Sequence, residues 1–344
     1  MKMDKIMLAC GGGGEEMGAL INGLIFKVFD NEILARGDDS ALLEIAGFSG
    51  DLAGASLAFS TDSFVVSPRE FAGGDIGKLA VCGTVNDLAM VGAKPLALSC
   101  ALIIEEGFSY AELEKILQNM KKTADSAGVK IVCGDTKVVP NGACDGLFIN
   151  TAGIGVAVRK AQIARLKAGA KILLSGDIGR HGATLMAARH NMQSSLQSDC
   201  ACLNGVVNEL LSAGVDALCM RDATRGGLSA VLNEWANESK LSIRVYEEQI
   251  AISDEVLGLC ELLGFESYEL ANEGTFVLAV EQKDEAKALE ILCKHNANAT
   301  CIGEIINTDE NGALKGKPCV ILQNAYGASR FLEPPKGELL PRIC

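Results

Sequence analysis

Hydrophobic residues of the chain gather in short runs that predict buried strands. The runs at 57–63 and 96–104 each have the length of a strand and end at polar residues. Between them, a stretch of small and apolar residues up to about Val91 predicts a helix that carries Asn86 and Asp87. Two later runs predict further strands at 129–133 and 148–158.

The most regular amphipathic helix begins after Ser109. Ser109 and Glu112 have the spacing of a capping box, which satisfies free backbone N–H groups of the first turn. Apolar residues follow at helical spacing, at positions 113, 116, 117, 120 and 124. Gly128 is expected to end the helix, because glycine adopts the left-handed backbone of a C-terminal cap without strain.

The second half of the chain repeats this mixture of strands and helices. Arg159, Lys160 and Gly169 interrupt the pattern and predict a boundary near residues 159–170. Beyond it, strands are predicted at 171–175 and 276–280, and helices at about 182–190, 200–213, 226–238 and 284–294. The mixture predicts an α/β or α+β protein with two domains, residues 1–158 and 168–330.

The last stretch, residues 331–344, is expected to form an extended, mobile tail. It holds three of the seven prolines, which lack a backbone donor and break helices. Its final residue is Cys344, and the thiolate is the reactive form of cysteine. A thiol on such a tail can be presented to different active sites. A cysteine without a function at this position remains the alternative.

Composition and charge restrict the classes of function. The chain has 344 residues, with 31 Lys and Arg against 44 Asp and Glu, so its net charge is −13. Nucleic acids and anionic membrane surfaces are therefore poor partners. No apolar run approaches the roughly 20 residues of a membrane span, and the first residues do not resemble a signal peptide. We expect a cytoplasmic protein whose 13 cysteines, which include no CxxC pair, are reduced.

Five aspartates are predicted at strand ends or in turns, namely Asp39, Asp62, Asp87, Asp135 and Asp222. Carboxylates from several loops suit Mg²⁺, which takes oxygen ligands and bridges to substrate phosphates. Neither a Walker A motif nor a dinucleotide-binding GxGxxG turn accompanies them. Ordinary helix caps and turns, which aspartate also favours, remain the alternative.

Two further features are candidates for chemistry. Glu273 lies between Asn272 and Gly274, just before the strand predicted at 276–280, and a partly desolvated carboxylate there can act as a general base. A plain turn is the alternative for this segment. Four consecutive glycines at 11–14 can form either a phosphate loop or a flexible hinge.

Seven short motifs are distributed along essentially the whole chain. They are 59–63 (FSTDS), 73–80 (GGDIGKLA), 83–87 (GTVND), 134–139 (GDTKVV), 221–227 (RDATRGG), 271–274 (ANEG) and 341–344 (PRIC). Together and in this order they resemble the HypE family of hydrogenase maturation factors. One position departs from the family, since Cys10 stands before the glycine run where many members have histidine.

The resemblance implies a fold and an activity. The fold is that of the PurM-like, ATP-dependent superfamily of aminoimidazole ribonucleotide synthetase and selenophosphate synthetase, with an N-terminal sheet that pairs with a second copy in a homodimer. A HypF-type carbamoyltransferase would load a carbamoyl group onto Cys344. The chain would dehydrate this S-carboxamide to an S-cyanide with ATP and Mg²⁺. A HypC–HypD complex would then accept the cyanide for the iron of [NiFe]-hydrogenase.

The resemblance also implies roles for individual residues. Cys344 would carry the substrate, Glu273 would be the base, and Lys137 would stabilise charge. The nucleotide would be bound by Asp39, Asp62, Asn86, Asp87, Asp135, Thr136, Asp222 and Thr224. Mg²⁺ would be held by Asp39, Asp62, Asp87 and Asp222.

Two other functions stay open from the sequence alone. Selenophosphate synthetase has a reactive N-terminal cysteine that Cys10 loosely resembles, but it needs a lysine close behind, and none lies between Cys10 and Lys27. The second is a non-catalytic thiol carrier, which relays a group between partners. A carrier has no use for a magnesium–nucleotide site, so removal of the aspartates distinguishes it from an ATP-dependent dehydratase.

Overall fold

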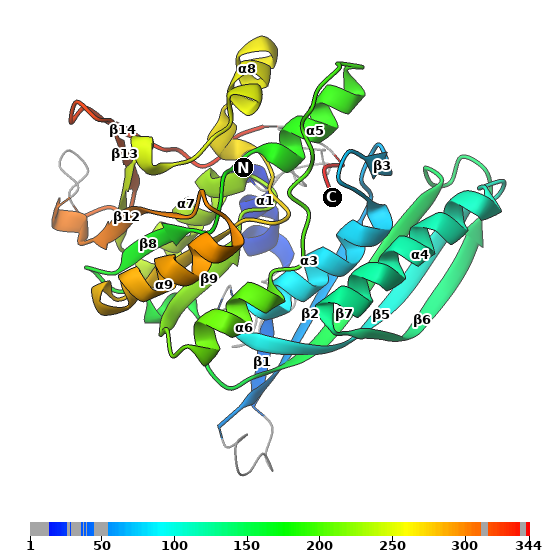
Figure 1. The fold of residues 1–344 in the computed structure, drawn as a ribbon, viewed down its shortest axis with the longest axis horizontal. Helices are drawn as coiled ribbons and strands as arrows, with labels where there is room; N and C mark the ends of the chain where they lie inside the picture. Colours follow the sequence, from blue (N-terminus) through cyan, green and yellow to red (C-terminus); the bar gives the residue numbers. More distant parts are fainter. Residues whose placement is uncertain are drawn as a thin grey trace.

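The computed structural model contains two mixed α/β parts, each built on its own sheet (Figure 1). It describes residues 14–25, 28, 36, 38, 40–44, 54–310, 316–337 and 342–344. Within these ranges, none of the helices is long and apolar enough to cross a membrane.

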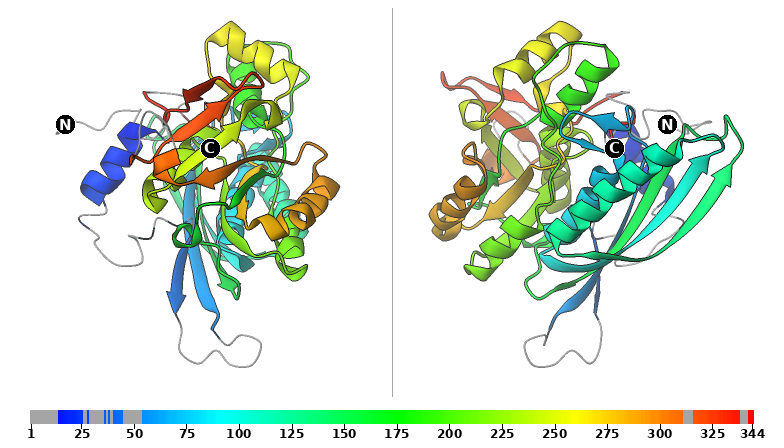
Figure 2. Two further views of the ribbon diagram at one scale, coloured as in Figure 1. Left: turned by 90° about the vertical axis from the view of Figure 1, so that its left-hand side faces the viewer. Right: turned by 45° about the vertical axis from the view of Figure 1, so that its right-hand side comes forward.

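The first sheet has five strands in the order β1-β2-β7-β5-β6. They are β1 (Ala41–Glu44), β2 (Ser56–Phe64), β5 (Ala93–Glu105), β6 (Lys130–Val139) and β7 (Leu147–Ala157). Helices α3 (Ile76–Met90) and α4 (Tyr110–Ala127) lie on one face of this sheet (Figures 1 and 2). The opposite face carries exposed apolar side chains, among them Phe59, Ile103 and Ile154.

Local sequence explains where α3 and α4 begin and end. The Asp75 carboxylate caps α3 by accepting from the Lys78 backbone N–H at 2.8 Å. Ser109 caps α4 in the same way by accepting from the N–H of Glu112. Gly128 ends α4 with a left-handed backbone, φ 72°. The predicted limits of this helix are therefore confirmed.

The second sheet has seven strands in the order β14-β13-β10-β12-β8-β11-β9. They are β8 (Lys171–Leu174), β9 (Ala217–Asp222), β10 (Ser242–Tyr246), β11 (Phe276–Val280), β12 (Thr300–Ile306), β13 (Val320–Gln323) and β14 (Ser329–Phe331). Helix α7 (Gly227–Ser239) packs on one face through the fully buried Trp235. Helices α6 (Asn204–Ser212) and α9 (Gln282–His295) cover the other face.

The remaining elements are short or lie outside the two layers. The helices are α1 (Glu15–Leu20), α5 (Arg180–Arg189) and α8 (Asp254–Leu263). Single turns are η2 (Ile21–Ile25), η5 (Ile163–Arg165), η6 (Glu247–Gln249), η7 (Ser267–Glu269) and η8 (Thr308–Glu310). Strands β3 (Glu70–Phe71) and β4 (Gly74–Asp75) form a small hairpin before α3.

The two parts share hydrophobic cores. Ala89 and Met90, at the end of α3, pack with residues of α6 and α9. In return, Ala271 of the loop before β11 packs in the core of the first part, together with Ile343 and Cys344 from the end of the chain. The junction between the two parts therefore brings together segments that are far apart in the sequence.

Two predicted elements were placed wrongly. The strand predicted at 129–133 continues to Val139, because β6 pairs in parallel with β5 as far as Glu105. Asp135 therefore lies within a strand and not at its end, and Asp87 lies within α3 and not in a turn. The helix predicted at 200–213 begins only at Asn204, because residues 200–203 bond to their surroundings instead; the Leu203 N–H, for example, donates to the side chain of Asn86 at 2.7 Å.

Candidate active site

The end of the chain lies alongside the residues that follow β2. The N–H of Val65 donates to the main-chain oxygen of Cys344 at 2.9 Å, and the N–H of Ser67 donates to that of Arg342 at 3.1 Å. This alternation is that of a short antiparallel pairing. The Arg342 side chain reinforces it, since Nε donates to the Val65 carbonyl at 2.8 Å and the guanidinium lies over the Phe148 ring. The tail is thus docked at its end.

Two side chains of α5 hold the same segment from the other side. The Nε2 atom of His181 lies 2.8 Å from the carbonyl oxygen of Ile343. Arg189 donates from one Nη to the Arg342 carbonyl at 2.6 Å and from Nε to the Ser67 carbonyl at 2.7 Å. Because α5 belongs to the second part, these bonds place the terminal residues at the junction of the two parts.

The docked thiol of Cys344 is buried, with 6% of the residue exposed. Burial raises the pKa of this thiol to about 12, and the negative charges of Glu273, Asp62 and Asp222 add to the increase. The guanidinium of Arg225 opposes it. The docked thiol is therefore neutral near pH 7 and is a poor nucleophile, because the thiolate is the reactive form.

Glu273 is the most deeply buried carboxyl group beside Cys344, with 2% of the residue exposed. Burial raises its pKa well above the usual value, and the neighbouring Cys200 and Asp222 raise it further. Its Oε1 atom has no hydrogen-bond partner among the described residues. A buried carboxyl group whose pKa is raised and whose oxygen is unpartnered suits proton transfer.

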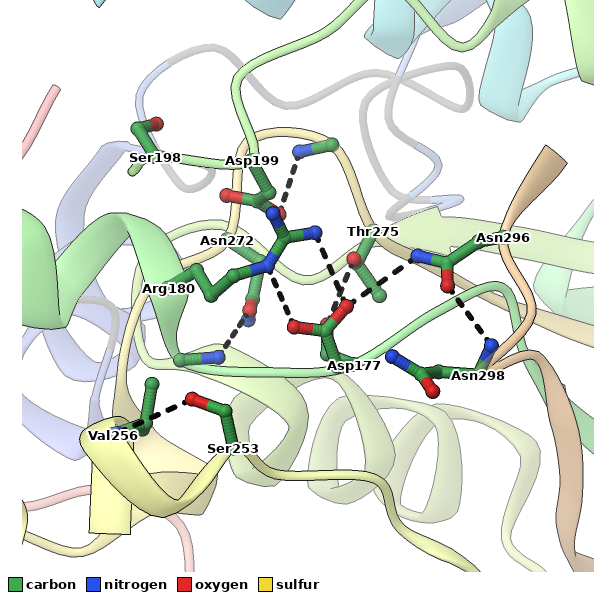
Figure 3. A network of polar contacts seen from close by, with 12 residues as sticks. Asp177, Arg180, Ser198, Asp199, Ser253, Val256, Asn272, Thr275, Asn296 and Asn298 are labelled. Carbon is green, nitrogen blue, oxygen red and sulfur yellow. Dashed lines mark hydrogen bonds and ion pairs between the residues drawn. The ribbon is translucent and has the colours of Figure 1, made fainter. Parts of the chain in front are cut away.

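The backbone around Glu273 is fixed by a network of polar contacts (Figure 3). The carboxylate of Asp199 accepts from the N–H of Glu273 at 3.1 Å and from that of Gly274 at 3.0 Å. The Oδ1 of Asn272 accepts from the N–H of Gly179 at 2.6 Å, and the Thr275 hydroxyl donates to a backbone carbonyl at 3.0 Å. The loop that carries Glu273 is therefore held on both sides.

Asn86 joins this loop to α3. Its side chain is fully buried; Oδ1 accepts from the N–H of Leu203, and Nδ2 donates to the carbonyls of Ala201 at 3.0 Å and Glu273 at 3.4 Å. Each of these bonds crosses from the first part of the chain to the second. The Asn86 side chain thus bonds to the backbone of Glu273, and both of its polar atoms are hydrogen-bonded to other residues of the chain.

Three of the predicted aspartates gather near the same point. Asp62, Asp87 and Glu273 all act electrostatically on Arg225, and Asp222 acts on Cys344. Burial raises the pKa of Asp62, while Arg225 lowers it. The Asp87 carboxylate accepts from the Ser60 hydroxyl at 2.6 Å.

The described side chains of this region offer oxygen ligands, but they do not form a complete metal-binding site. Thr224 is half-buried and lies in the loop that follows Asp222. Among the described residues, no three His, Cys, Asp or Glu side chains are arranged to hold a metal ion. Asp39, Cys10 and glycines 11–13 lie outside the described residues.

The remaining predicted residues, Asp135, Thr136 and Lys137, lie in the exposed edge strand β6. The strand register places Asp62 level with Gly134, three strands away, or about 14 Å at the usual strand spacing. Asp62 lies on the α3 face, since a Cβ at Gly83 would sit 3.5 Å from its carboxylate. Alternation then puts Asp135 and Lys137 on the opposite face, where they form an ion pair of 2.9 Å. Within one chain they do not join the cluster around Cys344.

Two family models match the chain in succession. Residues 37–157 match the N-terminal domain of AIR synthase related proteins, and residues 167–315 match the C-terminal domain. The chain is also 44% identical over 349 residues to carbamoyl dehydratase HypE of Escherichia coli (strain K12), a match that covers 99% of this chain and 100% of that protein. The chain belongs to the HypE family of carbamoyl dehydratases.

Solved structures of HypE proteins have the same fold. A chain in the crystal structure of a HypE–HypF complex is 43% identical, with a TM-score of 0.84, and the match covers 92% of this chain and 100% of that chain. A HypE in complex with ATP is 40% identical, with a TM-score of 0.81 and coverage of 99% and 100%. The predicted family and the two-domain PurM-like fold are therefore confirmed.

The structure adds site residues of this HypE-family chain that sequence reasoning missed. They are His181, Arg189, Asp199 and Arg225. Arg225 lies inside the motif at 221–227, so the sequence carried a signal for it. The other three have no sequence signal, because their role depends on contacts with segments more than seventy residues away.

Proposed function

We propose that this chain converts a carbamoyl group, carried as an S-carboxamide on Cys344, into an S-cyanide with ATP as the cosubstrate. The observation that carries the proposal is the position of Cys344, whose buried sulfur lies among Glu273, Arg225 and the Asp62 carboxylate. The cyanide becomes the iron ligand of [NiFe]-hydrogenase, and a HypC–HypD complex accepts it. Relatives described as a HypE–HypF complex and as HypE in complex with ATP support this reading.

The chemistry requires a better leaving group and a base. An amide oxygen leaves poorly, and the phosphoryl group that ATP supplies corrects this. The amide oxygen forms a bond to the γ-phosphorus of ATP as the bond from that phosphorus to ADP breaks and one N–H proton departs, which gives ADP and an S-bound imidate phosphate. Loss of the second N–H proton and cleavage of the C–O bond then form the C≡N bond and release phosphate. The protein must therefore accept protons and hold the departing phosphate.

Glu273 is the base in this proposal. Its buried carboxyl group has a raised pKa, so its ionised form is a stronger base than an exposed glutamate. The unpartnered Oε1 can accept a proton from the carbamoyl nitrogen on Cys344. Asp199 and Asn86 keep the backbone of Glu273 in place, and we assign Asn86 this positioning role.

Asp62, Asp87 and Asp222, with Thr224, line the side on which we place the nucleotide phosphates and Mg²⁺. Mg²⁺ commonly takes only one or two protein carboxylates and fills its other positions with waters and phosphate oxygens. A pair of these carboxylates therefore fits the ion without a closed protein cage. Asp39 is retained as a further ligand from the sequence.

The docked thiol must leave this position to meet other proteins. With 6% of Cys344 exposed, a carbamoyltransferase cannot reach the sulfur. We propose that residues 331–344 swing outward to a HypF-type donor, inward for dehydration, and outward again to the acceptor complex. The described cysteines are all free, and a free substrate thiol fits the reducing cytoplasm, where we place the reaction.

Lys137 acts across a homodimer in this proposal. The open face of the first sheet carries exposed apolar side chains beside Asp135 and Lys137, and a second copy of the sheet would cover it. Lys137 would then stabilise charge in the site of the partner subunit. Mixing the inactive variants Cys344→Ser and Lys137→Ala tests this. If Lys137 acts on the partner subunit, a mixed dimer combines an intact Cys344 with the Lys137 of the other chain and regains dehydration. If Lys137 acts within its own chain, the mixed dimer stays inactive.

Intact-mass spectrometry tests the central reaction. The protein is loaded with a HypF-type enzyme, carbamoyl phosphate and ATP, separated from the donor, and given Mg–ATP. We expect a gain of one carbamoyl group on Cys344, followed by ATP-dependent loss of one water. A Cys344→Ser control shows no gain. A stable carbamoyl adduct without water loss means that the chain is only a carrier.

A further inference from the structure

Arg225 differs from the other described arginines. Each of the others donates to a carbonyl or pairs with a carboxylate. These are Arg36, Arg69, Arg159, Arg165, Arg180, Arg189, Arg221, Arg244, Arg330 and Arg342. Among the described residues, the guanidinium of Arg225 has no hydrogen-bond acceptor and no ion-pair partner. Its five N–H donors are therefore available to a ligand.

The absence of a partner for Arg225 among the described residues is unexpected, because several acidic groups act on its guanidinium. The groups that raise the pKa of its guanidinium are Cys344, Asp62, Glu273 and Asp87, all of them acidic. A guanidinium among carboxylates normally closes onto one of them as a bidentate pair. Here the half-buried guanidinium forms no such pair with any described residue, so its N–H donors stay available to a polar group carried on Cys344.

The backbone explains why Arg225 stays in place. It lies in the short loop between β9 and α7. On one side, the N–H of Ala223 donates to the Thr275 carbonyl at 3.0 Å, and Asn272 donates to the Ala223 carbonyl at 2.9 Å. On the other side, Gly227 has φ 60°, and a Cβ there would approach the Tyr268 carbonyl to 2.5 Å. The loop is thus packed against the same segment that carries Glu273.

We propose that Arg225 is a catalytic residue that binds the oxygen of the S-carboxamide on Cys344. This inference rests on the proposed function and deepens it. The planar fork of N–H donors receives the carbamoyl oxygen and then the phosphate formed on it. When the C–O bond breaks, its electron pair leaves with the phosphate, and the guanidinium offsets the charge that develops there. Glu273 takes the N–H proton on the other side of the same group.

Variants of Arg225 in the preformed carbamoyl adduct test the inference. We expect Arg225→Gln to accept the carbamoyl group as the wild type does but to lose water about 100- to 1000-fold more slowly. Arg225→Lys should keep part of the rate, because lysine retains the charge but not the fork. Arg244→Gln, which removes an ion pair with Glu304 in the second sheet, is the matched control and should dehydrate normally.

Chemical rescue separates catalysis from a structural role. Added guanidinium chloride at millimolar concentration should restore part of the dehydration rate of Arg225→Ala and none of that of Glu273→Gln. The inference is overturned if Arg225→Gln dehydrates its adduct at the wild-type rate, or if a well-folded Arg225→Ala is not rescued. If the wild-type adduct itself loses no water, the proposed function fails, and this inference fails with it.

Discussion

The imidazole of His181 connects the tail to the loop before α6. Its Nε2 lies 2.8 Å from the carbonyl oxygen of Ile343, and its Nδ1 lies 2.7 Å from the hydroxyl of Ser198. The ring is fully buried, and burial lowers its pKa, so the imidazole is neutral. Because a carbonyl only accepts, the single N–H is on Nε2, and Ser198 donates to Nδ1. The bond between His181 and the tail therefore requires the tautomer with its proton on Nε2.

Replacement of His181 should release the tail. His181→Phe removes the bond to Ile343, and a lost buried hydrogen bond of about 1.4 kcal/mol corresponds to roughly tenfold more undocked tail. Since the docked thiol has a pKa of about 12, alkylation reports the undocked fraction. We expect iodoacetamide to modify Cys344 about tenfold faster, measured by mass spectrometry of the terminal peptide. The exposed His190→Phe is the control. Equal alkylation rates in the two variants would show that the bond from His181 does not hold the tail in its docked position.

Removal of the Glu273 carboxylate should stop dehydration without preventing loading. Glu273→Gln keeps the shape of the side chain but cannot accept a proton, so the carbamoyl adduct on Cys344 should accumulate. We expect a loss of about 100-fold or more in the rate of water loss. Glu269→Gln, a change of another partly buried glutamate whose pKa burial raises, is the matched control. Normal dehydration in Glu273→Gln would exclude this residue as the base.

The same carboxyl group predicts a pH dependence of the rate. Burial raises the pKa of Glu273, so the group is protonated at low pH and becomes a base only as pH rises through that value. The single-turnover rate of the adduct should therefore increase as pH rises above the usual glutamate range. Glu273→Gln should show no such rise in its residual rate.

The raised pKa of Glu273 also affects stability, and this effect runs against the effect on the rate: the rate rises with pH, whereas the free energy of unfolding falls. When pH rises above the usual glutamate range, the carboxyl group ionises easily in the unfolded chain but not in the folded one. The unfolded state is therefore favoured, and the stability of the wild type falls as pH rises. Glu273→Gln removes this loss. We expect its melting temperature to exceed that of the wild type by a margin that grows from pH 5 to pH 9. A margin that shrinks with pH would mean that Glu273 is ionised and paired.

Asn86 should matter for stability more than its size suggests. Asn86→Ala leaves the Leu203 N–H and two carbonyls without their buried partner, which costs about 1–3 kcal/mol of unfolding free energy. Urea denaturation measures this, with the exposed Asn237→Ala as control. Dehydration should also slow, because the Glu273 carbonyl loses a support. Unchanged stability would show that these bonds are replaced by water.

Local patterns predicted much of the fold because several elements carry their own signals. Ser109 and Gly128 mark the two ends of α4, and the run at 276–280 coincides with β11. The gathering of Asp62, Asp87, Asp222, Glu273 and Cys344 was implied by motifs and not by periodicity. In the structure, the charges of Asp62, Asp222 and Glu273 act on the thiol of Cys344, and their proposed roles stay predictions.

What the sequence could not predict depends on pairing between distant segments. Strand β6 continues past Cys133 only because β5 offers backbone partners, so Lys137 is on a sheet edge and not in a loop. The docking of Cys344 depends on the N–H of Val65, and a backbone group has no signature in a sequence. The isolation of Arg225 is likewise a property of its neighbours.

Single-turnover stoichiometry tests whether ATP drives the dehydration of the adduct on Cys344. Carbamoyl adduct on Cys344, freed of the donor enzyme, is mixed with Mg–ATP, and the intact mass and the released ADP are followed together. We expect each chain to lose one water and release one ADP at the same rate, while the remaining carbon and nitrogen stay on the sulfur. Loss of the whole carbamoyl group, or loss of water without ADP, would contradict this expectation.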